Sequence, residues 1–116
     1  MDARIMDSRI RLVQGDTGPQ IQVTLTDEST GSAIDLREAT ATLHFRSETT
    51  GVTLFSRDLT IPEITAEQGI AIVVWESTDL NQDPGDYEGE IEVVLATGIR
   101  QTVYDVLKFR LREDYA

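Results

Sequence analysis

The residues whose spacing comes closest to a chemical motif lie between Asp79 and Glu90. Asp79, Asn81 and Asp83 alternate, and Glu90 stands at the twelfth position, which is the ligand spacing of a calcium-binding loop. Such a loop needs glycine at its sixth position for a sharp turn, and the sixth residue here is Pro84. No helical periodicity flanks the segment. We therefore predict that these residues shape a turn and bind no metal.

Two further groups of residues could serve catalysis. Glu88, Glu90 and Glu92 fall on one face of an alternating run, and paired carboxylates carry out glycoside hydrolysis. That face is predicted to be exposed, with no sign of a cleft. His44 is the only histidine, and no serine or cysteine at a plausible turn completes a triad. Nucleophile elbow, phosphate-binding loop and dinucleotide fingerprint are all missing from the sequence. We predict a protein that is not an enzyme and uses no cofactor.

Asp83, Gly85 and Tyr87 form the pattern Asp-x-Gly-x-Tyr immediately before an alternating strand. In immunoglobulin-like sandwiches, a tyrosine near the start of a strand hydrogen-bonds to the backbone just upstream, which is called the tyrosine corner. The pattern favours an all-β fold, an Ig-like antiparallel β-sandwich with about seven to eight strands. The position of the second disulfide cysteine in antibody domains is Gly89 here, and the chain has no cysteine. Packing alone must hold the predicted sandwich together.

Short alternating runs with turn residues between them recur along the chain, as in a sandwich or a barrel. The clearest is residues 20–26, where Ile21, Val23 and Leu25 point inward. The apolar run at residues 69–75 predicts the most buried strand. The other predicted elements are strands at residues 9–14, 41–46, 52–57, 86–96 and 101–112, an irregular edge-like segment at 59–65 and a single helical turn at 76–82.

Length and composition restrict the classes of protein. A chain of 116 residues predicts one domain, at residues 9–116, preceded by a flexible N-terminal arm at residues 1–8. The formal net charge of −11 argues against binding to nucleic acid or to anionic membranes. No apolar stretch is long enough to span a bilayer, and the N-terminus lacks the apolar region of a signal peptide. We expect a soluble protein made in the cytoplasm.

Positive charge is concentrated near the two ends of the chain. Residues 1–11 and 100–116 hold seven of the ten basic residues and a net charge of +2, whereas residues 12–99 have a net charge of −13. Two interpretations stay open: a solvated, mildly basic face shared by the two terminal segments, or a face that docks onto an acidic surface of another copy or partner. For Glu88, Glu90 and Glu92, we favour pairing with the bases of the last strand over an acidic stripe that recruits a ligand. The candidate interface residues are Ile5 and Met6 of the arm, with Arg9, Arg11, Lys108, Arg110 and Arg112.

Several segments together carry a family likeness. Residues 13–19 resemble the x-Gly-Asp-Thr opening of phage-encoded Ig-like domains, and residues 34–46 are similar to the segment in those domains that starts with Asp-Leu-x-x-Ala-Thr. Residues 75–80, 84–93 and 98–103 agree in order and spacing. The chain thereby resembles the N-terminal domain of baseplate upper proteins and related small tail, neck or head-associated proteins of tailed phages.

This resemblance implies a non-enzymatic virion structural protein of a tailed bacteriophage, an adaptor in the tail, baseplate or neck. Its partners would be other virion proteins and copies of itself, with no nucleic acid and no membrane. Because baseplate proteins continue into a longer chain, the end at Ala116 favours a small adaptor or decoration role. The alternatives are a capsid decoration or head-fibre-associated protein, or a host-surface or carbohydrate-binding module using exposed aromatics among Trp75, Tyr104 and Tyr115.

Overall fold

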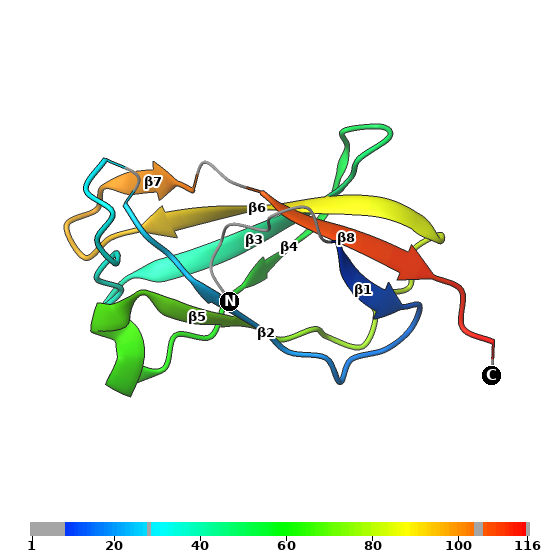
Figure 1. The fold of residues 1–116 in the computed structure, drawn as a ribbon, viewed down its shortest axis with the longest axis horizontal. Coiled ribbons are helices and arrows are strands. Elements are labelled where there is room, and N and C mark those ends of the chain that lie inside the picture. Colours follow the sequence, from blue (N-terminus) through cyan, green and yellow to red (C-terminus); the bar gives the residue numbers. More distant parts are fainter. Residues whose placement is uncertain (1–8, 28, 104–105, 116) are drawn as a thin grey trace.

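The computed structural model describes residues 9–27, 29–103 and 106–115. These residues form two β-sheets that lie face to face, with one short helix at one end (Figure 1). The elements are β1 (Ile10–Val13), β2 (Ile21–Thr24), β3 (Thr40–Ser47), β4 (Thr53–Asp58), the 3-10 helix η1 (Glu63–Gln68), β5 (Ile70–Val73), β6 (Gly85–Val94), β7 (Arg100–Thr102) and β8 (Leu107–Arg112). The predicted all-β class is therefore confirmed.

Within the described residues, the larger sheet has the strand order β1-β8-β6-β3-β4, and β7 extends it by pairing with β6. The smaller sheet consists of β2 and β5. The prediction of a wholly antiparallel arrangement is wrong at one edge, because β1 pairs with β8 in parallel, with Ile10 opposite Phe109. Parallel neighbours need a crossover, and here nearly the whole chain lies between them. The predicted strand at residues 101–112 is two strands, which pair with different halves of β6.

The segment at residues 59–65, predicted to be irregular, overlaps the start of η1, the one helix of the described residues. Pro62 precedes η1 with a φ of −64°, and Gly69 ends the helix with a φ of 74°. A Cβ atom at Gly69 would lie 2.5 Å from the carbonyl oxygen of Leu25 and 3.1 Å from that of Ile34. Glycine at this position therefore allows both the left-handed conformation and the close approach of η1 to the chain after β2.

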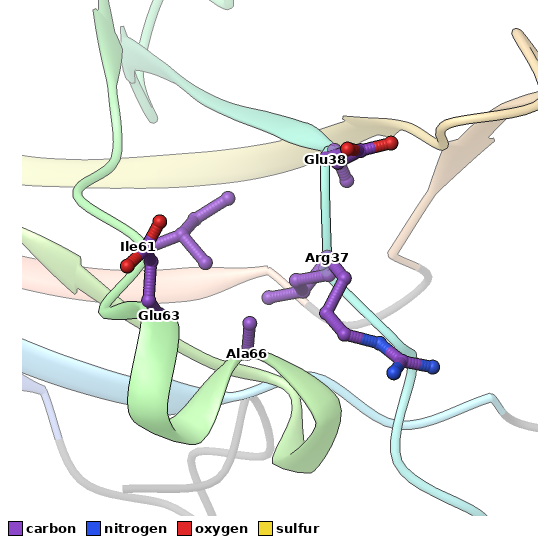
Figure 2. A pocket seen from close by; sticks show the side chains of 7 residues that line it. Arg37, Glu38, Ile61, Glu63 and Ala66 are labelled. Carbon is purple, nitrogen blue, oxygen red and sulfur yellow. The ribbon is translucent and has the colours of Figure 1, made fainter.

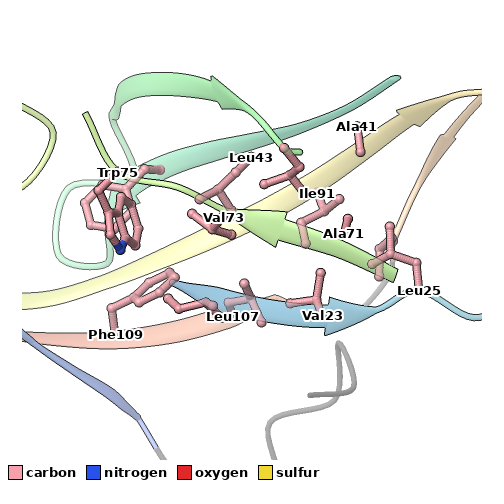
Figure 3. Packing of buried hydrophobic residues seen from close by; sticks show 14 of the residues in the cluster. Val23, Leu25, Ala41, Leu43, Ala71, Val73, Trp75, Ile91, Leu107 and Phe109 are labelled. Atoms are coloured by element: carbon pink, nitrogen blue, oxygen red, sulfur yellow. The ribbon is translucent and has the colours of Figure 1, made fainter. Parts of the chain in front are cut away.

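Alternating residues of both sheets meet in one apolar core. Val23 of β2 and Val73 of β5 point toward Leu43, Ile91 and Leu107 of the larger sheet, and all five are at most 1% exposed (Figure 3). Each of these residues belongs to the inward set of a strand with period-two alternation. The alternation at residues 20–26 thus predicted the buried face of β2, whereas β5, predicted as the most buried strand, alternates and buries only Ala71 and Val73.

An aromatic cluster occupies one end of this core. The Phe45 ring lies with its centroid 4.9 Å from that of Phe55, 5.0 Å from Tyr87, 5.3 Å from Phe109 and 5.8 Å from Trp75. Trp75 is 3% exposed and is therefore a core residue, not an exposed binding aromatic. It follows β5 and reaches the rings of the larger sheet edge-on, an arrangement that the charge distribution of aromatic rings favours.

Gly89 gives the cluster the room it needs. It pairs with Phe45 across β6 and β3. A Cβ atom there would lie 2.5 Å from Cδ1 of Leu43 and 3.1 Å from Cε2 of Phe109. Real side chains do not approach so closely, so any larger residue would displace both neighbours.

The corner before β6 is closed by a side chain. The Tyr87 hydroxyl donates a hydrogen bond to the backbone carbonyl of Asp83, which is the backward contact that the Asp-x-Gly-x-Tyr pattern predicts. Gly85, between them, has a φ of 155°, a value that residues with a side chain rarely adopt. Burial raises the pKa of the Tyr87 phenol, and the neighbouring Asp83 carboxylate acts in the same direction.

Replacing Tyr87 with phenylalanine tests this corner. The Asp83 carbonyl loses its donor, so we expect the free energy of unfolding to fall by about 1–3 kcal/mol. Urea denaturation followed by the fluorescence of Trp75, the only tryptophan, measures it. Tyr115→Phe is the matched control, because Tyr115 is 81% exposed. Equal losses in the two variants would contradict a stabilising role for the Tyr87 hydrogen bond.

Candidate interaction surfaces

Asp79, the first residue of the calcium-type spacing, makes structural contacts. The Asp79 carboxylate is 2% exposed and binds Arg57 through two contacts, Oδ1 to Nη2 at 2.5 Å and Oδ2 to Nε at 2.9 Å. It also accepts a hydrogen bond from the backbone N–H of Glu76 at 2.9 Å. Residues 76–82, predicted as one helical turn, form hydrogen-bonded turns around this carboxylate. Within the described ranges, no group of three or more potential metal ligands occurs.

The hairpin of β3 and β4 places a serine beside the histidine, which the sequence argument missed. Nδ1 of His44 lies 2.7 Å from Oγ of Ser56, and Glu90 is the neighbour of His44 on the other side. The pairing register of the hairpin is the signal that could have revealed Ser56. These three residues lie on the outer face of the sheet, and neither described pocket includes them. A serine nucleophile would need an oxyanion site above it, and a flat strand surface provides none.

The terminal strands lie side by side, as expected, but their basic side chains are largely paired. Nη1 of Arg9 lies 2.7 Å from Oε2 of Glu48, and Nζ of Lys108 lies 2.7 Å from Oε2 of Glu88. Arg110 contacts Asp86. The predicted pairing across β6 and β8 is confirmed for Lys108 with Glu88. It is wrong in its other partners, because Arg110 pairs with Asp86, and Glu92 lies 3.8 Å from Arg100, which precedes β8. A free basic face is not formed on the described part of the sheet.

The remaining interface candidates differ in what they contact. Arg112 donates to the backbone carbonyl of Glu113 at 2.8 Å, and its guanidinium lies 5.1 Å from the centre of the Tyr115 ring. Arg11 is exposed on β1. Ile5 and Met6, with the whole predicted arm, lie outside the described residues. Of the predicted basic residues on the described part of the chain, Arg11 is thus exposed and forms no ion pair within the described ranges, whereas Arg112 is held by its own C-terminal neighbours.

Ion pairing shifts the titration of this network. A hydrogen bond from Lys108 lowers the pKa of Glu88 below its ordinary value, and one from Arg46 adds to the effect. A hydrogen bond from Arg9 likewise lowers the pKa of Glu48. A carboxyl group with a lowered folded-state pKa stabilises the fold above its unfolded pKa, and this contribution is lost as the pH falls through the folded value.

The variant Glu88→Gln tests this linkage. The wild-type chain should lose stability as the pH falls from about 5 toward 3, and the variant should show a flatter profile over the same interval. Urea denaturation at several pH values measures both profiles. Thr102→Ser, a change on the neighbouring strand β7 that keeps every charge, is the control and should follow the wild type. Parallel profiles for wild type and Glu88→Gln would contradict the role of the carboxylate.

A surface pocket of about 570 Å³ lies at the opposite end of the larger sheet from the corner. One wall is the turn at residues 36–39, and the other is η1 (Figure 2). Ile61 and Ala66 point into the space between them. Leu36 and Ala39 complete the aliphatic lining, whereas Arg37, Glu38 and Glu63 provide the charged groups.

Backbone and side-chain contacts join the two walls of the pocket. The Leu36 N–H donates to the carbonyl of Ala66 at 2.9 Å. Arg37 binds Glu67 of η1 at 2.8 Å and Asp35 at 2.6 Å. Sequence reasoning missed this pocket because its walls are separated along the chain, and only the fold brings them together.

Glu38 has an unusual backbone conformation for its type. Its φ is 56°, and within the described residues it is the one residue other than glycine with a positive φ. The Ala39 N–H donates to the Leu36 carbonyl at 3.1 Å, which places Glu38 in the third position of a tight turn. Glycine or asparagine normally takes that position. The chain therefore holds an exposed carboxylate at a site where glycine would fit with less strain.

Glu38→Gly should raise the free energy of unfolding by about 0.5–1 kcal/mol. A left-handed residue with a side chain costs roughly 1–2 kcal/mol, and the larger entropy of glycine in the unfolded chain offsets part of the gain. Glu38→Ala is the control, because it removes the carboxylate and keeps the strained Cβ atom. Thermal unfolding of both variants separates the two effects; an equal midpoint for Gly and Ala would contradict backbone strain at Glu38.

The aromatic candidates for carbohydrate binding do not form a platform in the described structure. Trp75 is buried, Tyr104 lies outside the described residues, and Tyr115 is exposed beside Arg112. None of the described helices is long and apolar enough to cross a membrane. A comparison of the sequence with protein-family models and with curated proteins found no match.

Proposed function

We propose that the protein is a non-enzymatic structural module of the immunoglobulin-like class that works by binding other proteins. Two facing sheets and the hydrogen bond from Tyr87 to the carbonyl of Asp83 support an Ig-like sandwich with a tyrosine corner. The inner faces of both sheets are filled by side chains of the core, which leaves the surfaces and ends of the sandwich for contacts.

The observation that carries this proposal is the position of the exposed aliphatic side chains. Val52 and Leu54, in and beside the β3–β4 hairpin, are 58% and 41% exposed. Ile64 of η1 and Ile99 of the β6–β7 connection are 94% and 60% exposed, and these elements lie at the other end of the molecule (Figure 1). A rigid body 44 Å long with apolar contact points at both ends can join two neighbours.

We further propose that these neighbours are components of a tailed-phage particle and that the protein is a virion structural protein, an adaptor of the tail, baseplate or neck. The resemblance of residues 34–46 and 84–93 to phage Ig-like domains supports this assignment. Copies of the chain itself are among the proposed partners. A carbohydrate-binding role has less support, because the described aromatics do not gather on the surface.

Purified particles test the assignment directly. We expect quantitative mass spectrometry of gradient-purified phage particles to find the chain in a fixed ratio to the major tail or capsid protein. The ratio should persist after a wash in high salt, because apolar contacts are not screened. A host protein of similar abundance is the control for contamination. Absence from the particles, with presence in the infected cell, would contradict a virion role.

A further inference from the structure

The pocket between residues 36–39 and η1 carries acidic side chains that no described basic side chain neutralises. Glu38 and Glu63 stand at this pocket, and neither has a hydrogen-bonding or ion-pairing partner among the described residues. Arg37 is the one basic residue of the lining, and Asp35 and Glu67 already hold it. The lining thus has two unpaired acids beside its aliphatic residues, and its one base is neutralised by two acids outside the lining.

We propose that this pocket is the docking site for a basic aliphatic segment of a partner protein, an extended stretch in which lysine or arginine stands beside leucine, isoleucine or valine. An aliphatic side chain would pack on Ile61, Leu36 and Ala66, and the neighbouring cation would reach Glu38 or Glu63. The inference rests on the proposed function, since it assigns to one end of the module the contact by which a partner is bound.

A basic aliphatic segment matches the charge of this pocket better than a phosphate-bearing ligand, an anionic lipid surface or a metal ion does. Phosphate-bearing ligands and anionic lipid surfaces would meet the uncompensated carboxylates of Glu38 and Glu63. A free metal ion would require converging ligands, and Figure 2 shows the Glu38 side chain directed away from the space that Ile61 and Ala66 face. A long cationic side chain needs only one carboxylate within reach, and its aliphatic stem covers apolar surface.

The pocket is already formed in the free chain. The Leu36–Ala66 hydrogen bond and the Arg37–Glu67 ion pair hold its walls together, and Gly69 seats η1 against the chain after β2. A site that needs no ordering on binding loses less conformational entropy, so a short segment can bind without a large interface.

Glu38 adds an independent indication of a binding role. Its carboxylate is kept on a strained, left-handed residue, at φ 56°, where no contact within the described structure uses it. Residues held in sparsely populated conformations concentrate at ligand sites, and the inference runs from the observed outlier to the role. The cost in stability is compensated if the carboxylate serves binding.

The free edge of β4 is a weaker docking site, although Val52 and Leu54 lie near it. The register of β3 and β4 shifts between Phe45 and Arg46, which marks a bulge. Arg57 pairs with the core residue Leu43 and turns its charge toward the buried carboxylate of Asp79. Bulges and inward-pointing charges are the features by which natural sheets prevent a strand from adding to an edge.

Nuclear magnetic resonance titration of the full, isotope-labelled chain tests the proposal. The probe is the capped peptide acetyl-Gly-Leu-Lys-Leu-Gly-amide, and the control peptide carries glutamate in place of lysine. We expect amide signals of residues 36–39 and 61–68 to shift with the lysine peptide, with a dissociation constant of about 1 mM or lower. No shift of these signals at about 10 mM peptide, or equal shifts with the glutamate peptide, would overturn the proposal.

Matched variants assign the effect to the two carboxylates. Glu38→Gln with Glu63→Gln should weaken binding about tenfold, because both charges are removed without change in side-chain size. Asp16→Asn with Glu113→Gln makes the same change in net charge at exposed positions away from the pocket and should bind like the wild type. Equal affinity of the two double variants would overturn the proposal. The fluorescence of Trp75 checks that each variant is folded.

The outcomes separate this inference from the proposed function. If the chain is present in particles but its pocket does not bind the lysine peptide, the proposed virion role stands and the proposed docking site is rejected. A chain that binds the peptide at Glu38 and Glu63 but is absent from particles retains the docking site and loses the virion role.

Discussion

Packing around the Phe45 ring determines the spacing of the two sheets at the corner end. The ring contacts Phe55, Tyr87 and Phe109 within the larger sheet and Trp75 from the segment after β5. The position of Phe109 in this cluster depends on the missing side chain of Gly89, because a Cβ atom there would lie 3.1 Å from Cε2 of the Phe109 ring. Because neighbouring residues of a strand point to opposite faces, fixing Phe45 and Phe109 inward also fixes Arg46 and Lys108 outward, where both reach Glu88. The charged network of the outer face is thus a consequence of the aromatic packing beneath it.

Local patterns predicted much of this fold and less of its surface. Period-two alternation identified the main strands and their buried faces, and the spacing of Asp83 and Tyr87 predicted the contact between them. Alternation carries no information on which strands are neighbours, so the parallel edge of β1 could not be predicted from it, and the His44–Ser56 contact follows only once the register of the β3–β4 hairpin is known. Charge counts along the chain suggested a basic face, which the acids of β6 and the β3–β4 hairpin neutralise. Pairing depends on register, and composition does not report register.

Ion-paired and unpaired charged side chains lie in different parts of the molecule. On the outer face of the larger sheet, bases from the chain ends meet acids from its middle, and exposed pairs of this kind contribute little to stability but leave little net field. At the η1 end the acids outnumber the bases, and Glu38 and Glu63 have no ion-pairing partner among the described residues. Electrostatic attraction of a partner therefore favours approach along the long axis rather than onto the sheet face.

The parallel pairing of β1 with β8 has a mechanical consequence. A partner that pulls on the residues before Ile10 and another that pulls on those after Arg112 draw these strands past each other along their length. The backbone hydrogen bonds of this ladder, from Ile10–Phe109 to Val13–Arg112, then resist together in shear instead of opening one at a time. A chain loaded in this way would bear tension through the edge of one sheet, while the core behind that edge stays intact.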